Sequence, residues 1–104
     1  MEPIRALIAE DDLFYQRLVI AGLEGLKSLV FNTVVIQSGR EALGLLLQND
    51  FDLAIADFHL PDCTADTIGA EMRVHEITTP LIIVTADGSP VTERRARSVS
   101  PAFF

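Results

Sequence analysis

Short apolar runs alternate with longer segments of helical character along this chain, and that alternation limits the folds that it can adopt. Four runs are predicted strands: residues 4–9, 29–36, 53–56 and 81–85. They are almost continuously apolar, which is typical of strands in a parallel sheet that is covered on both faces. Four other segments are predicted helices: residues 13–27, 39–48, 64–76 and 90–98. The order βαβαβαβα therefore predicts an α/β fold, a doubly wound parallel sheet.

Residues that start helices support this assignment. Asp12 is a predicted N-cap of the first helix, and Ser38 with Glu41 three residues later has the pattern of a capping box before the second. Pro90 falls in the first turn of the last helix, where its missing N–H costs nothing. The first helix carries apolar residues at roughly helical spacing: Phe14, Leu18, Leu23 and Leu26.

Acidic and hydroxyl side chains stand where the predicted strands end. Glu10 and Asp11 end the first strand, Asp57 the third and Thr85 the fourth. Sites in open parallel sheets form outside the carboxyl ends of the strands, so we expect all four residues at one edge of the sheet. Three carboxylates so placed would raise one another's pKa values unless a divalent cation is bound, and an all-oxygen site suits Mg²⁺.

A carboxylate beside Mg²⁺ has a chemical use. It can act as a nucleophile toward a phosphoryl group and form an aspartyl phosphate, and a hydroxyl such as Thr85 can bind a phosphoryl oxygen. Each residue also has a plainer explanation: Asp57 as a strand-end residue, Glu10 and Asp11 as acids favoured by a helix dipole, Thr85 as an ordinary β-branched residue. Asp12 already serves as the helix-start acid, and the register of the whole set favours the nucleophile.

Size and charge exclude several classes of protein. The chain has 104 residues, 49% of them hydrophobic, which fits one domain with a core. Its apolar runs are far below the ~18 to 20 residues of a membrane span, and no secretory signal is visible. A single cysteine, Cys63, permits no internal disulfide framework, so a cytoplasmic setting is expected. A net charge of −7 disfavours direct binding to nucleic acid. The arginines of "TERRAR", residues 92–97, are interpreted as a solvated helix face, with a docking surface for an acidic partner as the alternative.

Several stretches, taken in order, resemble the receiver domain of two-component response regulators. "ALIAEDD" (6–12) carries an acidic pair, "FDLAIADFHLPD" (51–62) an Asp before a D-x-x-L-P-like turn, and "PLIIVTADG" (80–88) a Thr-Ala pair. "SGREAL" (38–43) is similar to the usual start of the family's second helix. Each motif alone is weak, but the ordered set is specific and covers essentially the whole chain. The resemblance implies a flavodoxin-like, doubly wound fold.

The resemblance also implies roles for individual residues. Glu10 and Asp11 would be the acidic pair that binds Mg²⁺, and Asp57 would be both the phosphoacceptor and a Mg²⁺ ligand. The backbone carbonyl of His59 would be a further Mg²⁺ ligand. Thr85 would be the switch hydroxyl that binds the phosphoryl group.

Two further positions and one departure follow from the same resemblance. His59 and Asp87 occupy the places that tune dephosphorylation in such domains, and Phe104 falls on the switch aromatic. Family members usually continue into a fifth strand ending in Lys-Pro and a fifth helix, whereas this chain has no lysine after Lys27. We therefore expect one receiver domain over residues 1–104, truncated before that lysine and helix. A missing helix predicts an exposed apolar face and self-association.

Three functions fit these residues. The first is a non-enzymatic signalling module: Asp57 accepts a phosphoryl group from a histidine kinase or a phosphotransfer protein and a protein-binding face then switches toward an output partner. The second, motivated by the absent lysine, is a non-phosphorylated interaction module of the same fold. The third is a Mg²⁺-dependent phosphatase, although such enzymes place an acid where this chain has His59. A homodimer through the incomplete face is a further expectation, and no membrane or nucleic-acid partner is expected.

Overall fold

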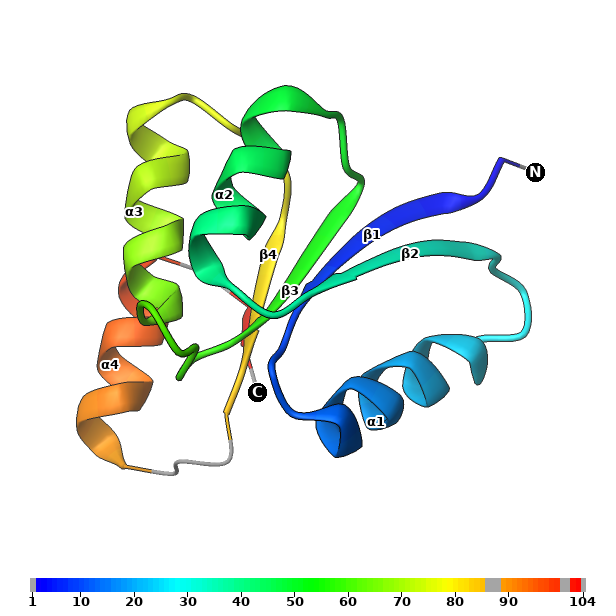
Figure 1. Ribbon diagram of the computed structural model, residues 1–104, viewed down its shortest axis with the longest axis horizontal. Coiled ribbons are helices and arrows are strands. Elements are labelled where there is room, and N and C mark those ends of the chain that lie inside the picture. The colour runs from blue at the N-terminus through cyan, green and yellow to red at the C-terminus, as the bar shows by residue number, and fades with distance from the viewer. Residues whose placement is uncertain (1, 86–88, 100–101, 104) are drawn as a thin grey trace.

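The structure, a computed structural model, describes residues 2–85, 89–99 and 102–103. The strands are β1 (Ile4–Ala9), β2 (Phe31–Ile36), β3 (Leu53–Asp57), β4 (Leu81–Val84) and β5 (Ala102–Phe103). The helices are α1 (Leu13–Glu24), α2 (Gly39–Gln48), α3 (Ala65–Val74) and α4 (Pro90–Val99) (Figure 1). Among the described residues, no helix has the length and apolar character that crossing a membrane requires.

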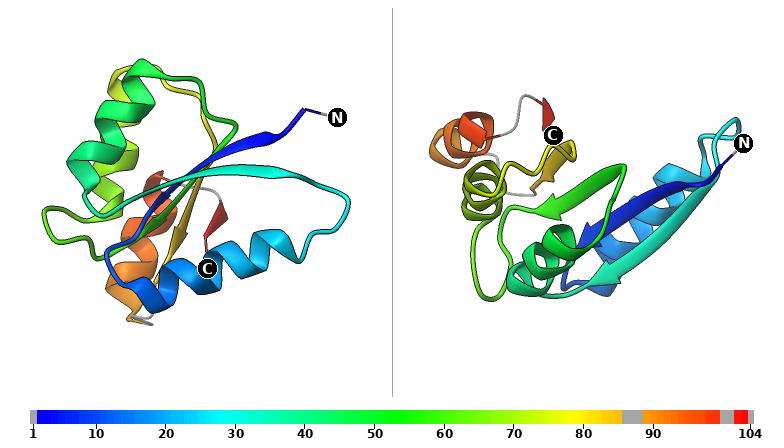
Figure 2. Two further views of the ribbon diagram at one scale, coloured as in Figure 1. Left: turned by 45° about the vertical axis from the view of Figure 1, so that its right-hand side comes forward. Right: turned by 90° about the horizontal axis from the view of Figure 1, so that it is seen from above.

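The strands form one parallel sheet in the order β2-β1-β3-β4-β5. The chain steps from β1 outward to β2, then returns past β1 to β3 and continues to β4 and β5. Because strand–helix–strand crossovers are right-handed, this reversal places α1 on one face of the sheet and the three later helices on the other. Figures 1 and 2 show that arrangement, with α2, α3 and α4 grouped together and α1 apart. The predicted doubly wound parallel sheet is confirmed.

The hydrophobic core lies between the sheet and the three grouped helices. Alternate residues of the central strands belong to it, among them Leu7 of β1 and Ile83 of β4, which are at most 1% exposed. Leu46 of α2 and Ile68 of α3 pack against the same cluster. Full burial of one such side chain stabilises a fold by about 1.5 to 3 kcal/mol, so the burial on this face contributes substantially to stability.

The opposite face of the sheet is less completely covered. Strand register puts Ile8, Ile55 and Ile82 side by side on this face. Ile8 and Ile55 are buried, whereas Ile82 and its same-face neighbours Leu53 and Val84 are only partly buried. Among the described helices, α1 alone covers this face.

Helix α1 itself keeps much of its apolar surface in solvent. Leu13, Phe14 and Leu18 are 61%, 64% and 51% exposed, and the buried residue of the helix is Gln16. The apolar spacing that predicted this helix therefore does not mark a buried face. Exposed apolar surface, which the sequence predicted, is present on this helix, and self-association stays a prediction.

Several element boundaries differ from the prediction by two or three residues. Helix α1 ends at Glu24 instead of residue 27, because the N–H of Leu26 bonds the Leu23 carbonyl three residues back, at 3.0 Å, and so leaves the i→i−4 pattern of the helix. Strand β2 begins at Phe31 instead of residue 29. Helix α3 ends at Val74, two residues before the predicted end, because Glu76 adopts a φ of 56°, which no right-handed helix allows.

The predicted caps of the first two helices are confirmed. The Asp12 carboxylate accepts the N–H groups of Phe14 and Tyr15 at 2.8 and 3.2 Å. The Ser38 hydroxyl accepts the N–H of Glu41 at 3.3 Å, which is one half of the capping box.

Candidate functional site

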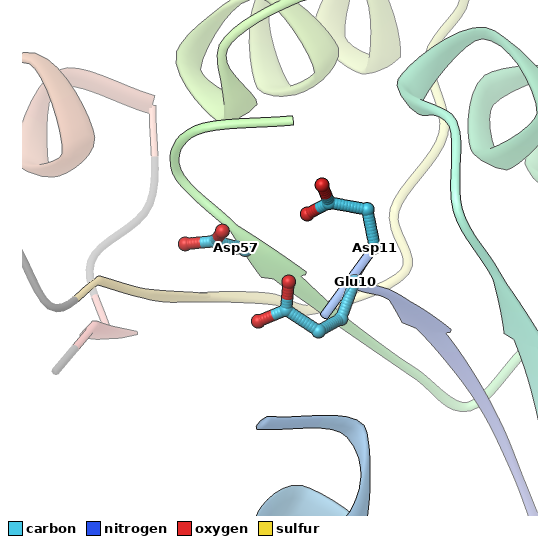
Figure 3. A group of neighbouring side chains, drawn as sticks. All are labelled: Glu10, Asp11 and Asp57. Atoms are coloured by element: carbon cyan, nitrogen blue, oxygen red, sulfur yellow. The ribbon is translucent and has the colours of Figure 1, made fainter. Parts of the chain in front are cut away.

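Three carboxylates meet where β1 and β3 end. The two strands are parallel with Ala9 opposite Ala56, so the residues that follow, Glu10 and Asp57, lie side by side. Carboxylate oxygens of Glu10, Asp11 and Asp57 lie within 4.8 Å of one another. Figure 3 shows the three side chains gathered at the strand ends. The convergence expected from the sequence is confirmed for this cluster.

A small cavity of about 120 Å³ opens beside the carboxylates. Its lining residues are Glu10, Tyr15, Asp57, Val84 and Thr85. Thr85 therefore joins the same edge of the sheet as the acids, as its position after β4 predicted. Tyr15 was not foreseen. Its signal is local: Asp12 caps α1, and a residue in the first helical turn stays near the acidic segment that precedes the cap.

The environment of Glu10 favours the protonated form of its carboxyl group. Burial raises its pKa from 4.5 to about 7, and the nearby charges of Asp57 and Asp11 add to that rise, against a backbone hydrogen bond from Asp12. Repulsion among the acids was expected from the sequence, but the larger cause is desolvation, because Glu10 is only 7% exposed.

Burial also raises the pKa of the phosphoacceptor candidate, Asp57. A hydrogen bond from the backbone N–H of His59 opposes that rise, and the charge of Asp11 adds to it. Bringing a divalent cation to the cluster would favour all the ionised forms at once, because opposite charge nearby stabilises a carboxylate.

Hydrogen bonds anchor the acidic segment to helix α1. The side-chain amide of Gln16, which is buried, donates to the carbonyl of Glu10 at 2.6 Å. The N–H of Asp12 donates to a Glu10 carboxylate oxygen at 3.3 Å, while the Asp12 carboxylate caps the helix. The orientation of Glu10 is thus fixed by the start of α1 and by the end of β1 together.

The loop after Asp57 returns closely on itself. Phe58 is fully buried and its N–H donates to the Val84 carbonyl at 2.9 Å. His59 forms an antiparallel bridge with Thr64, and its N–H contacts the Asp57 carboxylate. The role of the His59 carbonyl as a metal ligand stays a prediction. Two other predicted positions, Asp87 and Phe104, lie outside the described residues.

A further acid, Asp62, was missed from the sequence and connects this loop to helix α2. The Asp62 carboxylate accepts hydrogen bonds from the Ser38 hydroxyl and from the N–H groups of Gly39 and Arg40, at 2.9, 2.8 and 3.0 Å. These backbone hydrogen bonds lower the pKa of Asp62 to about 2. The pairing spans more than twenty residues of sequence, so no local pattern could reveal it.

The arginines of "TERRAR" are exposed, as the interpretation of a solvated helix face predicted, but Arg95 also makes specific contacts that the sequence did not reveal. Its Nε donates to Asp66 Oδ2 of α3 at 2.8 Å, and its Nη2 donates to Thr64 Oγ1 at 3.1 Å. The Arg95 guanidinium carbon also lies over the Phe58 ring, 5.2 Å from the ring centroid. Although burial acts in the opposite direction, hydrogen bonds from Thr64 and Arg95 lower the pKa of Asp66. Arg95 thus joins α4 to α3 and to the loop.

The donor set of the carboxylate cluster fits a hard divalent cation. It offers oxygen atoms only, from carboxylates at the ends of two adjacent strands, and has room beside it for further oxygen ligands. Mg²⁺ prefers this kind of site, with few protein ligands and several waters or phosphate oxygens. Protein zinc sites usually include nitrogen or sulfur ligands, which the cluster does not contain.

Comparison with known proteins gives a consistent picture. The family model for the response regulator receiver domain matches residues 6–100. The cell cycle transcriptional regulator CtrA of Caulobacter vibrioides is 32% identical over 82 residues, which are 79% of this chain and 34% of that protein. The chain thus spans about a third of the length of this curated relative.

Solved structures share the fold along nearly the full length. The receiver domain of a Francisella response regulator has a TM-score of 0.80 and 26% identity, covering 99% of this chain and 83% of the other. The receiver domain of a sensor histidine kinase from Pseudomonas aeruginosa, with magnesium in its active-site cleft, has a TM-score of 0.84. It is 19% identical, covers 99% of this chain and 84% of the other, and shows likeness of fold alone.

The flavodoxin-like sheet, the acids at the ends of β1 and β3 and the family match point to one conclusion. The match covers nearly the whole chain and includes every strand of the central sheet except the short β5 and the start of β1. This chain belongs to the response regulator receiver domain family of two-component signalling.

Proposed function

We propose that residues 1–104 act as one phosphoacceptor domain, in which Asp57 receives a phosphoryl group in a Mg²⁺-dependent reaction. The observation that carries the proposal is the meeting of Glu10, Asp11 and Asp57 within 4.8 Å. Thr85 lines the cavity beside them. The cation would be held by these three carboxylates and by the His59 carbonyl, and would supply positive charge that offsets the repulsion between an anionic nucleophile and an anionic phosphoryl donor.

The chain's own residues prepare Asp57 as a nucleophile. Its place at the end of a buried strand fixes its direction, and the His59 N–H favours its ionised form. A carboxylate oxygen of Asp57 attacks phosphorus, and the P–N bond to the donor histidine breaks. The electron pair of that bond stays on the imidazole, which takes up a proton. Thr85 then hydrogen-bonds a phosphoryl oxygen, and this contact would shift the region around α4.

Intact-mass analysis tests this proposal. The protein is incubated with acetyl phosphate and MgCl₂, and we expect it to gain one phosphoryl group, which hydroxylamine removes because an acyl phosphate is labile. Asp57→Asn should gain nothing, and neither should wild type in EDTA. Asp52→Asn, a change to an exposed acid just before β3, is the matched control and should react as wild type does. A folded wild type that gains no phosphoryl group would disprove the proposal.

A non-phosphorylated interaction module is the second candidate, because the sequence holds one lysine, Lys27. That residue lies at the opposite end of the strands from the acids, next to the start of β2. This candidate predicts a partner whose affinity is the same with and without Mg²⁺ and acetyl phosphate. A surface plasmon resonance measurement with a captured partner, with and without the two reagents, separates it from the first.

The partners follow from the first candidate. We propose a histidine kinase or phosphotransfer protein as the phosphoryl donor, and a protein as the output partner, all in the cytoplasm. A homodimer through the exposed face of α1 is a further proposal, supported by the exposure of Leu13, Phe14 and Leu18. The net charge of −7 supports protein partners over nucleic acid.

A further inference from the structure

We infer that Asp62 is a positioning residue for the phosphoacceptor site, acting through the loop between β3 and α3. Its carboxylate contacts helix α2 and does not belong to the metal-binding cluster. The inference rests on the proposed function, because it assigns a support for that same site.

Asp62 supplies helix α2 with an acceptor from a distant part of the chain. Ser38 already caps this helix by accepting the Glu41 N–H, so the helix start does not lack a cap of its own. The Asp62 carboxylate instead binds the remaining N–H groups of the first turn, those of Gly39 and Arg40, together with the Ser38 hydroxyl. Charge-assisted hydrogen bonds at a helix N-terminus are among the stronger polar contacts, so the loop is held firmly.

The contact between the loop and the helix is also sterically tight. A Cβ atom at Gly39 would collide with the Cys63 sulfur and come within 3.3 Å of an Ile68 methyl group. Glycine is thus needed here for close approach, and the loop packs directly on the first turn of α2. The hydrogen bonds of Asp62 and this packing act at the same place, so they fix one position of the loop.

Short connections lead from Asp62 to the phosphoacceptor. The Leu60 N–H donates to the Cys63 carbonyl at 3.1 Å, which closes a turn around Asp62. His59 precedes that turn, bridges to Thr64 and donates its N–H to the Asp57 carboxylate. When the turn loses its attachment to α2, the backbone of His59 gains freedom. Its N–H and carbonyl are the groups that the site needs in fixed positions.

Isothermal titration with MgCl₂ tests the inference directly. Asp62→Ala should weaken Mg²⁺ binding by about tenfold, the usual effect of losing a residue that supports a ligand. The rate of phosphorylation at saturating MgCl₂ should fall as well, and the His59 amide should exchange its hydrogen faster in metal-free protein. The control is Asp52→Ala, which removes the same charge and a comparable hydrogen bond, from the Arg5 N–H at 2.9 Å, at the far end of β3.

Two further variants separate position from charge. Asp62→Asn keeps an acceptor for the Gly39 N–H but loses the charge, whereas Asp62→Glu keeps the charge but cannot place its oxygens at the same donors. If the position of the acceptor oxygens matters, the Mg²⁺ affinity of Asp62→Asn is closer to that of wild type than the affinity of Asp62→Glu is. If Asp62 acts only through its negative charge, Asp62→Glu binds Mg²⁺ as tightly as wild type and Asp62→Asn binds it as weakly as Asp62→Ala. That result would overturn the inference.

The remaining outcomes are also decisive. Should Asp62→Ala fail to fold, Asp62→Asn keeps one acceptor oxygen and leaves the Ser38 cap in place, and it is expected to weaken Mg²⁺ binding in the same direction, by a smaller factor. Equal Mg²⁺ affinity and equal His59 exchange in wild type and in the folded Asp62 variants would overturn the inference and leave the proposed function intact. A folded wild type that binds no Mg²⁺ would overturn both.

Discussion

At the scale of single residues, burial sets the protonation of the metal-binding candidates. The pKa of Glu10 rises from 4.5 in an ordinary environment to about 7 in the folded chain. An acid of this kind holds its proton more tightly when folded, so its contribution to stability is most favourable below pH 4.5 and falls as the pH rises to about 7. Above that pH the metal-free protein retains an ionised, buried carboxylate, which weakens folding.

Glu10→Gln should therefore raise the melting temperature of the metal-free protein at about pH 8, and do so much less at about pH 5. Differential scanning calorimetry in EDTA measures both values. Added MgCl₂ should raise the melting temperature of wild type more than that of the variant, because the variant lacks one charged ligand. Equal effects of the substitution at the two pH values would contradict the explanation.

Gly39 and Cys63 give a second residue-scale prediction. Gly39→Ala should destabilise the chain by about 1 to 3 kcal/mol, the usual cost of overpacking, because the new Cβ meets the Cys63 sulfur. Urea denaturation followed by circular dichroism measures the change.

Cys63→Ala removes that sulfur and makes space for the new Cβ. The double variant Gly39→Ala/Cys63→Ala should therefore recover most of the stability lost in the single variant, and a double-mutant cycle would report a favourable coupling. If the stability losses of the two single variants simply add in the double variant, the contact between the new Cβ and the Cys63 sulfur does not cause the destabilisation.

At the scale of elements, the end of helix α3 contains a residue in an unfavourable conformation. The N–H of Ile77 donates to the Met72 carbonyl at 2.8 Å and that of Glu76 to the Arg73 carbonyl at 3.1 Å. This is a Schellman motif, and its left-handed position is usually glycine. Glu76 occupies it with a φ of 56°.

Glu76→Gly should stabilise the protein by about 1 kcal/mol, because glycine adopts this conformation without steric cost. The midpoint of urea denaturation is the measurement. Glu76→Ala is the matched control: it removes the same negative charge from the helix C-terminus but keeps a Cβ. An alanine variant as stable as the glycine variant would show that charge, and not backbone conformation, is responsible.

The same element shows what the sequence could and could not predict. Apolar runs and helix-start residues predicted strands β1 to β4, their order and the convergence of Glu10, Asp11 and Asp57, because those depend on local patterns and on one rule of sheet topology. The end of α3 was placed at residue 76 because Glu76 carries no sequence signal for a left-handed conformation. The contacts of Asp62 and Arg95 were missed because each joins segments that are far apart in sequence.

At the scale of the whole molecule, the two faces of the sheet are covered unequally. Helices α2, α3 and α4 bury the residues of one face, while α1 alone of the described helices lies on the other (Figures 1 and 2). Apolar side chains therefore remain exposed on α1, and Ile82 and Val84 of β4 are only partly buried. Surface of this kind favours association, whereas the net charge of −7 opposes it through repulsion between copies.

We expect the protein to self-associate reversibly through α1, with the fraction of dimer rising with concentration and with added salt, which screens the charge. Sedimentation velocity measures both dependences. Leu18→Glu should shift the equilibrium to monomer with little loss of folding stability, because Leu18 is 51% exposed and contributes little to the core. Val74→Glu is the matched control, since Val74 is 72% exposed but lies on α3, on the other side of the sheet. A protein that stays monomeric at every concentration, or one whose dimer is lost equally in both variants, would show that the α1 face is not the contact surface.

The dependence on salt tests the same contact separately. A dimer that weakens as salt is added would be held by ion pairs, and exposed leucine and phenylalanine side chains would not explain it.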